Sequence, residues 1–285
     1  MTAQITILAS GSAGNAALIR CNDEHWLIDI GLDPKELDRR LSVANTAWTQ
    51  IRGVLMTHRH SDHWNRRSLS RCVDTRTPVH CHRDHAEAFR GAVPVFESLE
   101  RQRLVHPFIG ERPVTLSSHW QCRPIRVRHD GGPTFGFRFE QRVVSEPSQS
   151  FAYVADLGCW DRGLLDRLLN VDLLAIEFNH DPELLLQSQR PPWLIRRIQG
   201  DEGHLSNSQA ADLVSEIVKH STSIPLRQLL LLHLSNECNS SELASSSARV
   251  ALDKAGSQAC VFAAQQDEPS PTFRVGESPQ MEPKL

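Results

Sequence analysis

The stretch Leu55-Met56-Thr57-His58-Arg59-His60-Ser61-Asp62-His63 decides how this chain is interpreted. It places three histidines and one aspartate within six residues, directly after an apolar run that is typical of a buried strand. Imidazole nitrogens and a carboxylate suit a divalent ion such as Zn²⁺ or Mn²⁺, and the stretch lacks the cysteines that structural zinc sites usually recruit. The spacing therefore predicts a catalytic and binuclear metal site. The alternative is a polar loop that happens to be rich in histidine.

Length and composition are consistent with one large domain. The 285 residues are 40% apolar, which suffices for a sizeable core. We expect the domain to cover residues 1–265 and the proline-rich residues 266–285 to form a flexible tail. The formal net charge of −3 excludes an overall basic protein that binds nucleic acid through its whole surface, so a polyanionic substrate has to be held locally.

The cysteines and the N-terminus indicate the compartment. The seven cysteines are odd in number, scattered and never arranged as C-x-x-C, which argues against a disulfide framework and against a zinc ribbon. The N-terminus has no basic start followed by an apolar segment, and no stretch approaches the length that crosses a bilayer. We therefore expect a cytoplasmic protein without a membrane partner.

The periodicity of apolar residues predicts an α/β fold. The chain opens with expected strands and one helix, continues with a mostly β middle part, and ends with helices and strands that alternate. The expected strands are residues 4–9, 17–20, 25–30, 51–56, 78–81, 114–116, 123–127, 134–140, 151–155, 173–178 and 228–232, and the expected helices are 35–43, 82–90, 161–169, 208–220 and 241–255. Two β-rich halves, each followed by helices, would give two sheets face to face with helices outside, a four-layer αββα sandwich.

A family resemblance becomes specific upstream of the histidine cluster. Asp29 in Leu27-Ile28-Asp29-Ile30-Gly31, followed by the cluster, resembles the first two motifs of the metallo-β-lactamase superfamily. This resemblance implies an αββα sandwich with metals at one sheet edge. It also implies three later site residues at strand ends, for which the chain offers His129, Asp156 and His233 in the right order.

The same resemblance implies a ligand set for two divalent ions, Zn²⁺ or Mn²⁺. One ion would be held by His58, His60 and His129, the other by Asp62, His63 and His233, with Asp156 between them. Asp29 would orient a ligand histidine through the second nitrogen of its imidazole.

Further segments resemble the YycJ/WalJ-like branch of this superfamily, cytoplasmic enzymes regarded as DNA exonucleases. The segments are Leu8-Ala9-Ser10-Gly11-Ser12-Ala13-Gly14-Asn15-Ala16, the cluster, Glu177-Phe178-Asn179-His180-Asp181, Gly203-His204-Leu205-Ser206-Asn207 and Leu232-His233-Leu234-Ser235. The resemblance departs at Trp64-Asn65, where relatives commonly have a glycine, and at Cys238, which precedes Asn239 where relatives often have paired asparagines.

His204 is also similar to the histidine of transfer-RNA 3′ processing nucleases in the same superfamily, a proton donor partnered by a glutamate. Glu177 matches that glutamate, and a carboxylate partner favours the protonated imidazole that a general acid needs. Asp62 could also position the nucleophile. The other interpretation is that His204 caps the helix expected at 208–220 and that Glu177 lies on the surface.

Several residues are candidates for contacts to a phosphodiester. Asn179 or His180 could contact a non-bridging oxygen, paired arginines could hold phosphates, and tryptophans could stack on bases. The arginines are Arg66, Arg67, Arg196 and Arg197, and the tryptophans are Trp64 and Trp193, all of which could instead be ordinary surface or packing residues.

Three functions compete at this stage. The first is a metal-dependent phosphodiesterase or exonuclease that acts on DNA, which the pair Glu177 and His204 favours. The second is a small-molecule hydrolase of the same fold, for cyclic phosphodiesters, thioesters or lactones, since fold and metals do not select a substrate. The third is a metal-binding regulator without catalytic activity, which a missing ligand would favour.

Overall fold

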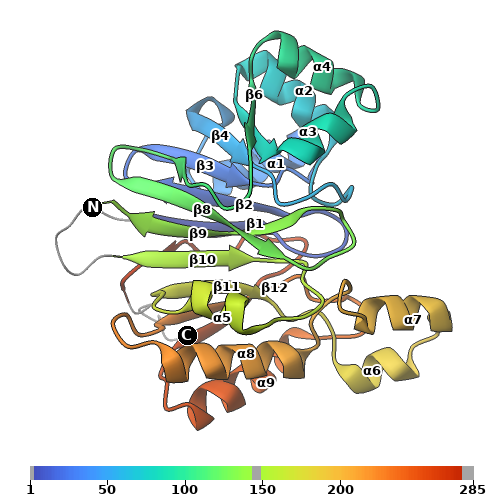
Figure 1. Cartoon of the computed structure of the whole chain (residues 1–285), viewed down its shortest axis with the longest axis vertical. Coiled ribbons are helices and arrows are strands. Elements are labelled where there is room, and N and C mark those ends of the chain that lie inside the picture. Colours follow the sequence, from blue (N-terminus) through green and yellow to red (C-terminus); the bar gives the residue numbers. More distant parts are fainter. Residues whose placement is uncertain (1–2, 143–148, 278–285) are drawn as a thin grey trace.

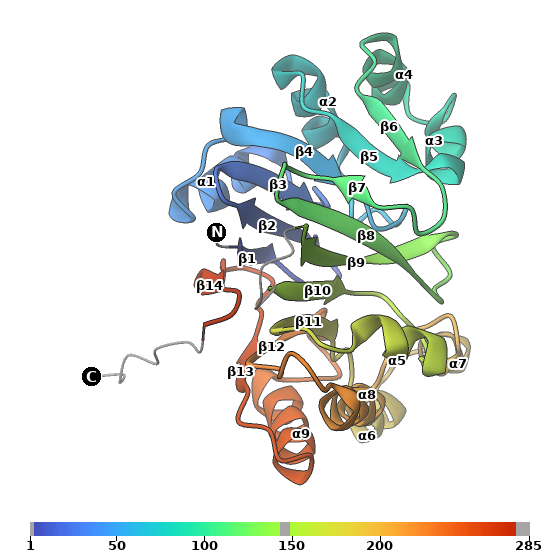
Figure 2. The ribbon, with the colours of Figure 1, turned by 60° about the vertical axis from the view of Figure 1, so that its left-hand side comes forward.

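Two mixed β-sheets pack face to face in a computed structural model that describes residues 3–142 and 149–277 (Figures 1 and 2). In these residues the first sheet has the strand order β14-β1-β2-β3-β4-β5-β6 and the second has the order β13-β12-β11-β10-β9-β8-β7. The first comprises β1 (Ala3–Ala9), β2 (Ala16–Cys21), β3 (Glu24–Ile28), β4 (Ile51–Leu55), β5 (Val79–His82), β6 (Val105–Phe108) and β14 (Phe273–Arg274). The second comprises β7 (Val114–Thr115), β8 (Trp120–Val127), β9 (Thr134–Gln141), β10 (Ser150–Val154), β11 (Leu173–Glu177), β12 (Gln228–Leu232) and β13 (Cys260–Ala263).

Helices cover the outer face of each sheet, which confirms the four-layer αββα sandwich (Figures 1 and 2). The first sheet is covered by α1 (Pro34–Val43), α2 (Arg66–Thr75), α3 (Arg83–Phe89) and α4 (Pro94–Arg101), with the 3₁₀ turn η1 (Trp48–Gln50) before β4. The second is covered by α5 (Arg162–Leu168), α8 (Asn207–His220) and α9 (Ser241–Lys254). The short helices α6 (Pro182–Gln187) and α7 (Pro192–Gln199) extend to one side of the second sheet (Figure 1).

Apolar residues that alternate along the strands form three core layers. Residues such as Ile5, Phe137 and Leu230 pack between the two sheets, and the opposite faces of the same strands pack against the helices. Each sheet joins an antiparallel meander, β1-β2-β3 or β8-β9-β10, to parallel strands that follow it. The carboxyl ends of the parallel strands in a sheet lie at the same edge, which is where α/β proteins usually place their sites.

The segment 266–277, which we expected within a flexible tail, belongs to the fold. Strand β14 pairs antiparallel with β1, and Phe273 and Val275 are buried between the sheets. Ser270 is tied to Ile7 in both directions, since its backbone N–H donates to the Ile7 carbonyl and its hydroxyl accepts from the Ile7 N–H. This pairing covers an edge strand that would otherwise expose its backbone groups. The rest of the expected tail, 278–285, lies outside the described residues.

Eight elements were not predicted from the sequence, namely the strands β6, β13 and β14, the helices α2, α4, α6 and α7, and the turn η1. The three strands are only two to four residues long, and α4, α6 and α7 are only six to eight. Such lengths give little periodic signal. None of the helices in the described part of the chain is long and apolar enough to cross a membrane.

Candidate metal centre

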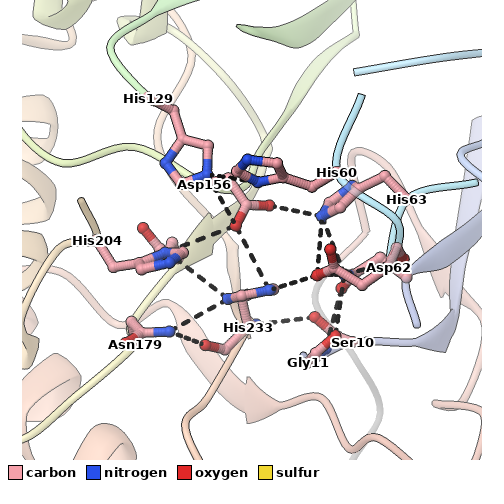
Figure 3. Close-up of polar contacts among 12 residues, drawn as sticks. Ser10, Gly11, His60, Asp62, His63, His129, Asp156, Asn179, His204 and His233 are labelled. Atoms are coloured by element: carbon pink, nitrogen blue, oxygen red, sulfur yellow. Dashed lines mark hydrogen bonds and ion pairs between the residues drawn. The ribbon is translucent and has the colours of Figure 1, made fainter. Parts of the chain in front are cut away.

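All seven predicted ligands come together at one edge of the sandwich. Figure 3 labels all of them except His58. The cluster loop follows β4, whereas His129, Asp156 and His233 follow β8, β10 and β12. Their side-chain donors form three overlapping groups, in each of which the donor atoms lie within 4.8 Å of one another. The groups are His58, His60 and His129; Asp62, His63 and His233; and His58, His63 and Asp156.

Two of the predicted ligands, His58 and His63, are fully buried, and hydrogen bonds fix the orientation of their rings. The Nδ1 atom of His63 lies 2.7 Å from Oδ2 of Asp29, so Nδ1 carries the proton and Nε2 faces the centre. Asp29 also accepts from the backbone N–H and the hydroxyl of Thr57, at 2.8 and 2.7 Å. Because that hydroxyl is already donating, it accepts from Nδ1 of His58 at 3.0 Å. Asp29 and Thr57 thus orient both rings.

The other three histidines are oriented in the same way by groups on the far side of each ring. Nδ1 of His129 lies 2.9 Å from the Gly203 carbonyl oxygen, and Nδ1 of His233 lies 3.4 Å from Oε1 of Glu177. His60 uses its other atom, since Nε2 lies 3.3 Å from Oδ1 of Asp130 while Nδ1 faces Nε2 of His129 at 3.2 Å. In each of the five rings, therefore, one nitrogen meets an acceptor outside the centre and the other points into it.

The inward-facing atoms fit a divalent cation. Nε2 of His58 is buried and has no hydrogen-bond partner among the described residues. Nε2 of His129 and Nδ1 of His60 face each other although both are acceptors once their opposite nitrogens are protonated. A buried set of imidazole nitrogens and carboxylates that face one another is a suitable environment for Zn²⁺ or a similar ion. The cluster can therefore hold metal.

Asp156 lies between the histidine groups. Its Oδ2 is 2.9 Å from Nε2 of His63, and its Oδ1 is 3.4 Å from Nε2 of His233 and 4.0 Å from Nε2 of His129. Only 2% of Asp156 is exposed. A carboxylate in this position can contact both halves of the centre, as the family resemblance implies.

The charges of the centre are strongly coupled. Burial alone would lower the pKa of His233, but the carboxylates of Asp156, Asp62 and Glu177 raise it to about 10. Burial likewise would raise the pKa of Asp156, yet the neighbouring imidazoles of His233 and His63 hold it well below its usual range. The positive charge of the protonated imidazoles thus offsets the negative charge of the carboxylates in this cluster. A bound cation has to replace those protons, so metal affinity should depend on pH.

His204 and Glu177 form the predicted pair beside the centre. Nδ1 of His204 lies 2.7 Å from Oε1 of Glu177, and its ring stacks on the ring of His233 at 5.2 Å. Glu177 is fully buried, and its Oε2 accepts from the backbone N–H groups of Leu157 and Leu205. Burial would raise the pKa of Glu177, but the charge and hydrogen bond of His204, together with the hydrogen bond of His233, lower it to about 2. Neither residue is a surface group, and the helix α8 is capped by Ser206 instead.

The residues suggested for substrate contacts mostly have other partners. The Asn179 amide donates to the His233 carbonyl at 2.8 Å, and His180 is 98% buried with its Nδ1 3.3 Å from Oδ1 of Asn179. Arg197 donates to Asp130 at 2.5 Å. Arg196 lines a cavity of about 670 Å³ together with Arg128 and Arg197.

The remaining candidates lie at the periphery. Arg67 pairs with Asp33 at 3.1 Å, and Arg66 is exposed at the start of α2. Trp64 donates through Nε1 to the Arg59 carbonyl and packs its ring on Phe89, whereas Trp193 on α7 is 61% exposed. Among the tryptophans considered, Trp193 is therefore the one available for stacking.

Sequence reasoning missed Asn15, which ties the Ser/Gly loop to the cluster. Its fully buried side chain lies 3.2 Å from Oδ2 of Asp62 and 3.0 Å from Nε2 of His63, and its backbone N–H donates to the Asp62 carbonyl at 2.7 Å. From the same loop, the Ser10 hydroxyl accepts from the His233 backbone N–H (Figure 3). The motif Ser-Gly-Ser-Ala-Gly-Asn indicated a turn, and nothing local in it indicated this long-range role.

Thr57, Asp130 and Gly131 were missed as well. Thr57 and Asp130 each orient a ligand ring, as described above. Gly131 lies against the imidazole of His58, where a Cβ atom would collide with the ring. A glycine directly after His129 and Asp130 is a weak signal in a single sequence, because it is also common in turns.

The comparison with known families agrees with this geometry. The family described as Beta-lactamase superfamily domain matches residues 25–233, a span that includes Asp29, the cluster and every later ligand. The chain belongs to the metallo-β-lactamase superfamily. It is also similar to "Exodeoxyribonuclease YycJ" of Bacillus anthracis, with 27% identity over 261 residues that cover 90% of this chain and 91% of the relative. The similarity thus extends along most of both chains, as the resemblance to the YycJ/WalJ-like branch predicts.

Solved structures share the fold. The metallo-β-lactamase fold protein YhfI from Bacillus subtilis aligns with a TM-score of 0.68 at 16% identity, covering 96% of this chain and 99% of that one. Zn²⁺-bound PqqB from Methylobacterium extorquens aligns with a TM-score of 0.64 at 12% identity, covering 94% of this chain and 99% of that one. At these identities the likeness establishes the architecture alone.

Proposed function

We propose that this metallo-β-lactamase-fold hydrolase is a binuclear metal-dependent phosphodiesterase that acts on DNA as an exonuclease. One ion would be held by His58, His60 and His129, the other by Asp62, His63 and His233, with Asp156 contacting both. Two divalent ions in such a site lower the pKa of a bound water and stabilise charge on the oxygens of a phosphodiester. Zn²⁺ or Mn²⁺ suits the donor set.

The observation that carries the proposal is the pair formed by His204 and Glu177. Glu177 holds the Nδ1 side of the His204 ring at 2.7 Å, so the free Nε2 is the atom from which a proton can be delivered. His204 lies next to the centre, with Nδ1 3.6 Å from Oδ1 of Asp156, and 15% of its side chain remains exposed. A general acid in this place can protonate the leaving oxygen of a phosphodiester, which a thioester hydrolase does not need to the same degree because a thiolate leaves more readily than an alkoxide.

The similarity to the relative named an exodeoxyribonuclease supports DNA as the substrate. Substrate contacts in this chain would come from Trp193 and Arg196 on α7, since Arg197, Asn179 and His180 are engaged elsewhere. Asp62 has the accessible position among the carboxylates of the centre, with 21% of its side chain exposed, and would position the nucleophile.

The test uses the whole protein loaded with Mn²⁺ or with Zn²⁺. It is incubated with end-labelled single-stranded DNA, double-stranded DNA and RNA, and with a small chromogenic phosphodiester. We expect stepwise release of nucleotides from DNA and its loss in Asp156→Ala. If neither ion supports cleavage of any nucleic acid while the protein is folded and contains metal, the nuclease proposal is wrong.

Hydrolysis of a small phosphodiester is a second candidate, favoured by the charges around the centre. The cavity next to His129, of about 540 Å³, is lined by Arg126, Arg128 and Arg167 but also by four carboxylates, namely Glu111, Asp130, Asp161 and Glu202. A groove for a long nucleic-acid backbone would be expected to carry a clear excess of positive charge. Turnover of the small phosphodiester without cleavage of any nucleic acid would select this candidate.

A further inference from the structure

Four of the five ligand histidines are oriented by groups that burial holds in place, and His60 is the exception. Asp29 and Thr57 are fully inaccessible, as is Glu177, and Gly203 acts through its buried backbone. The side chains of His60 and its partner Asp130 are 34% and 27% exposed. Packing alone therefore does not hold Asp130 in its orientation.

A second contact supplies the missing restraint. Arg197 donates through Nε to Oδ2 of Asp130 at 2.5 Å, while the other carboxylate oxygen, Oδ1, lies 3.3 Å from Nε2 of His60. The backbone N–H of Asp130 donates to the Glu202 carbonyl at 3.1 Å. The carboxylate is thus held on one side by a guanidinium and on the other by the ligand ring, the arrangement in which an outer partner fixes the tautomer of a ligand.

Arg197 belongs to a segment that reaches the centre at further points. It lies in the last turn of α7, and the turn that follows places the Gly203 carbonyl against His129. The backbone N–H of His204 donates to the Ile198 carbonyl at 2.9 Å. This short segment, residues 197–204, contains no predicted metal ligand. Its Gly203 carbonyl nevertheless contacts His129, its Arg197 reaches His60 through Asp130, and its His204 is the predicted general acid.

We propose that Asp130 and Arg197 are positioning residues for His60, so that the ion held by His58, His60 and His129 depends on a side chain from α7. This inference rests on the proposed metal centre and assigns Arg197 a role different from the phosphate contact that its sequence suggested. His60 has to present Nδ1 without a proton, which requires the proton on Nε2, where Asp130 accepts it. When Arg197 is lost, Asp130 can rotate into solvent and His60 loses this preference.

Arg196 provides a matched control. It is adjacent on the same helix and lines the same cavity of about 670 Å³, but its side chain has no hydrogen bond or ion pair to another described residue. Arg196→Ala removes the same charge from the same surface without touching Asp130. The comparison therefore separates the effect of losing a positive charge from the effect of losing the contact with Asp130.

The experiment compares Arg197→Ala, Asp130→Ala and Arg196→Ala with the parent protein. Each is titrated with Zn²⁺ against a chromophoric chelator to give the affinity of both ions, and with Co²⁺ to record the visible absorption that reports ligand geometry. We expect the first two variants to bind one ion about 10- to 100-fold more weakly and to alter its Co²⁺ spectrum, with the other ion unaffected. Arg196→Ala should match the parent protein in both readouts.

Two results would overturn the proposal. One is parental affinity for both ions in folded Arg197→Ala and Asp130→Ala, and the other is an equal loss in Arg196→Ala. Thermal melting of the metal-free proteins shows whether each variant folds, and Arg197→Lys, which keeps the charge, should fall between Arg197→Ala and the parent. Because metal affinity is measured without a substrate, a failure of the nuclease proposal leaves this test intact.

Discussion

The substitution Asp29→Asn tests whether the carboxylate beneath the centre sets the tautomer of His63. Asp29 is fully buried, and its Oδ2 accepts two hydrogen bonds of 2.7 Å, one from the Thr57 hydroxyl and one from Nδ1 of His63. Asparagine has nearly the same shape. It can still accept from the Thr57 backbone N–H through Oδ1, but its NH₂ group would then face both of the donors that Oδ2 accepted.

His63 can relieve its half of this conflict by moving the proton from Nδ1 to Nε2. The ring then accepts from the asparagine, but its N–H points at Asp156, into the position that an ion needs. Binding requires a return to the unfavourable tautomer, which corresponds to a 10- to 100-fold loss of metal affinity, or about 1.4–2.7 kcal/mol. The Thr57 hydroxyl loses an acceptor, so the free energy of unfolding should fall by a further ~1–3 kcal/mol.

The assay is a Zn²⁺ titration against a chelator, combined with urea unfolding of the metal-free protein. Asp33→Asn is the control, because Asp33 caps α1 from a partly exposed position, its ion pair with Arg67 lies at the surface, and asparagine caps a helix equally well. Parental metal affinity in a folded Asp29→Asn protein would refute the tautomer argument. A loss of stability with unchanged affinity would leave Asp29 as a purely structural residue.

Four further substitutions test other parts of the site and fold. His204→Ala should lower turnover by about 10²- to 10⁴-fold with unchanged metal content, and a missing ion in metal analysis would instead make His204 a ligand. Asn15→Ala removes one hydrogen bond to Asp62 and leaves the Gly11 N–H without its buried partner, so chemical denaturation should show a loss of about 2–3 kcal/mol. Gly131→Ala should displace the His58 ring and reduce bound metal, measured in a protein whose circular dichroism is unchanged. Phe273→Ala should cost about 3 kcal/mol in the same denaturation assay, whereas a residue in a flexible tail would cost nothing.

Most strands, and candidate ligands at their ends, could be predicted because both are local signals. A buried run such as Leu229–Leu232 has to end at the edge of a sheet, and His233 follows directly. Once His58 to His63 indicated a metal centre, a histidine or aspartate at each later strand end was a candidate. The structure brings all of these residues together.

Outer partners such as Arg197 and Asn15 could not be predicted, because each depends on a contact distant in sequence. Arg197 and Asp130 are 67 residues apart, and a pair of adjacent arginines has the same local pattern whether it meets a phosphate or a carboxylate. Asn15 lies 48 residues before His63 in a loop whose composition indicates only a turn. The segment 266–277 was misassigned because it is mostly polar and contains Pro269 and Pro271, while Phe273 and Val275 provide only two alternating apolar positions.

The directions in which the side chains of the site point could not be predicted from the sequence, for a further reason. It is visible at the outer partner Asp29 and at the predicted ligands Asp156 and His233. Each follows a residue that faces the core between the sheets, namely Ile28, Ala155 and Leu232. Continued alternation would therefore point all three side chains at the helix layers.

Instead all three adopt the left-handed backbone conformation, with φ of 58°, 56° and 54°. This conformation ends the alternation and turns the side chains into the centre, at a cost of about 1–3 kcal/mol for each residue that is not glycine. Hydrogen bonds such as those from the Asp29 N–H to the Leu55 carbonyl and from the His233 N–H to the Ser10 hydroxyl help to hold the turns. Glycine would relieve the strain but remove the side chain, so at these positions the need for a candidate ligand, or for the carboxylate that orients one, outweighs backbone preference.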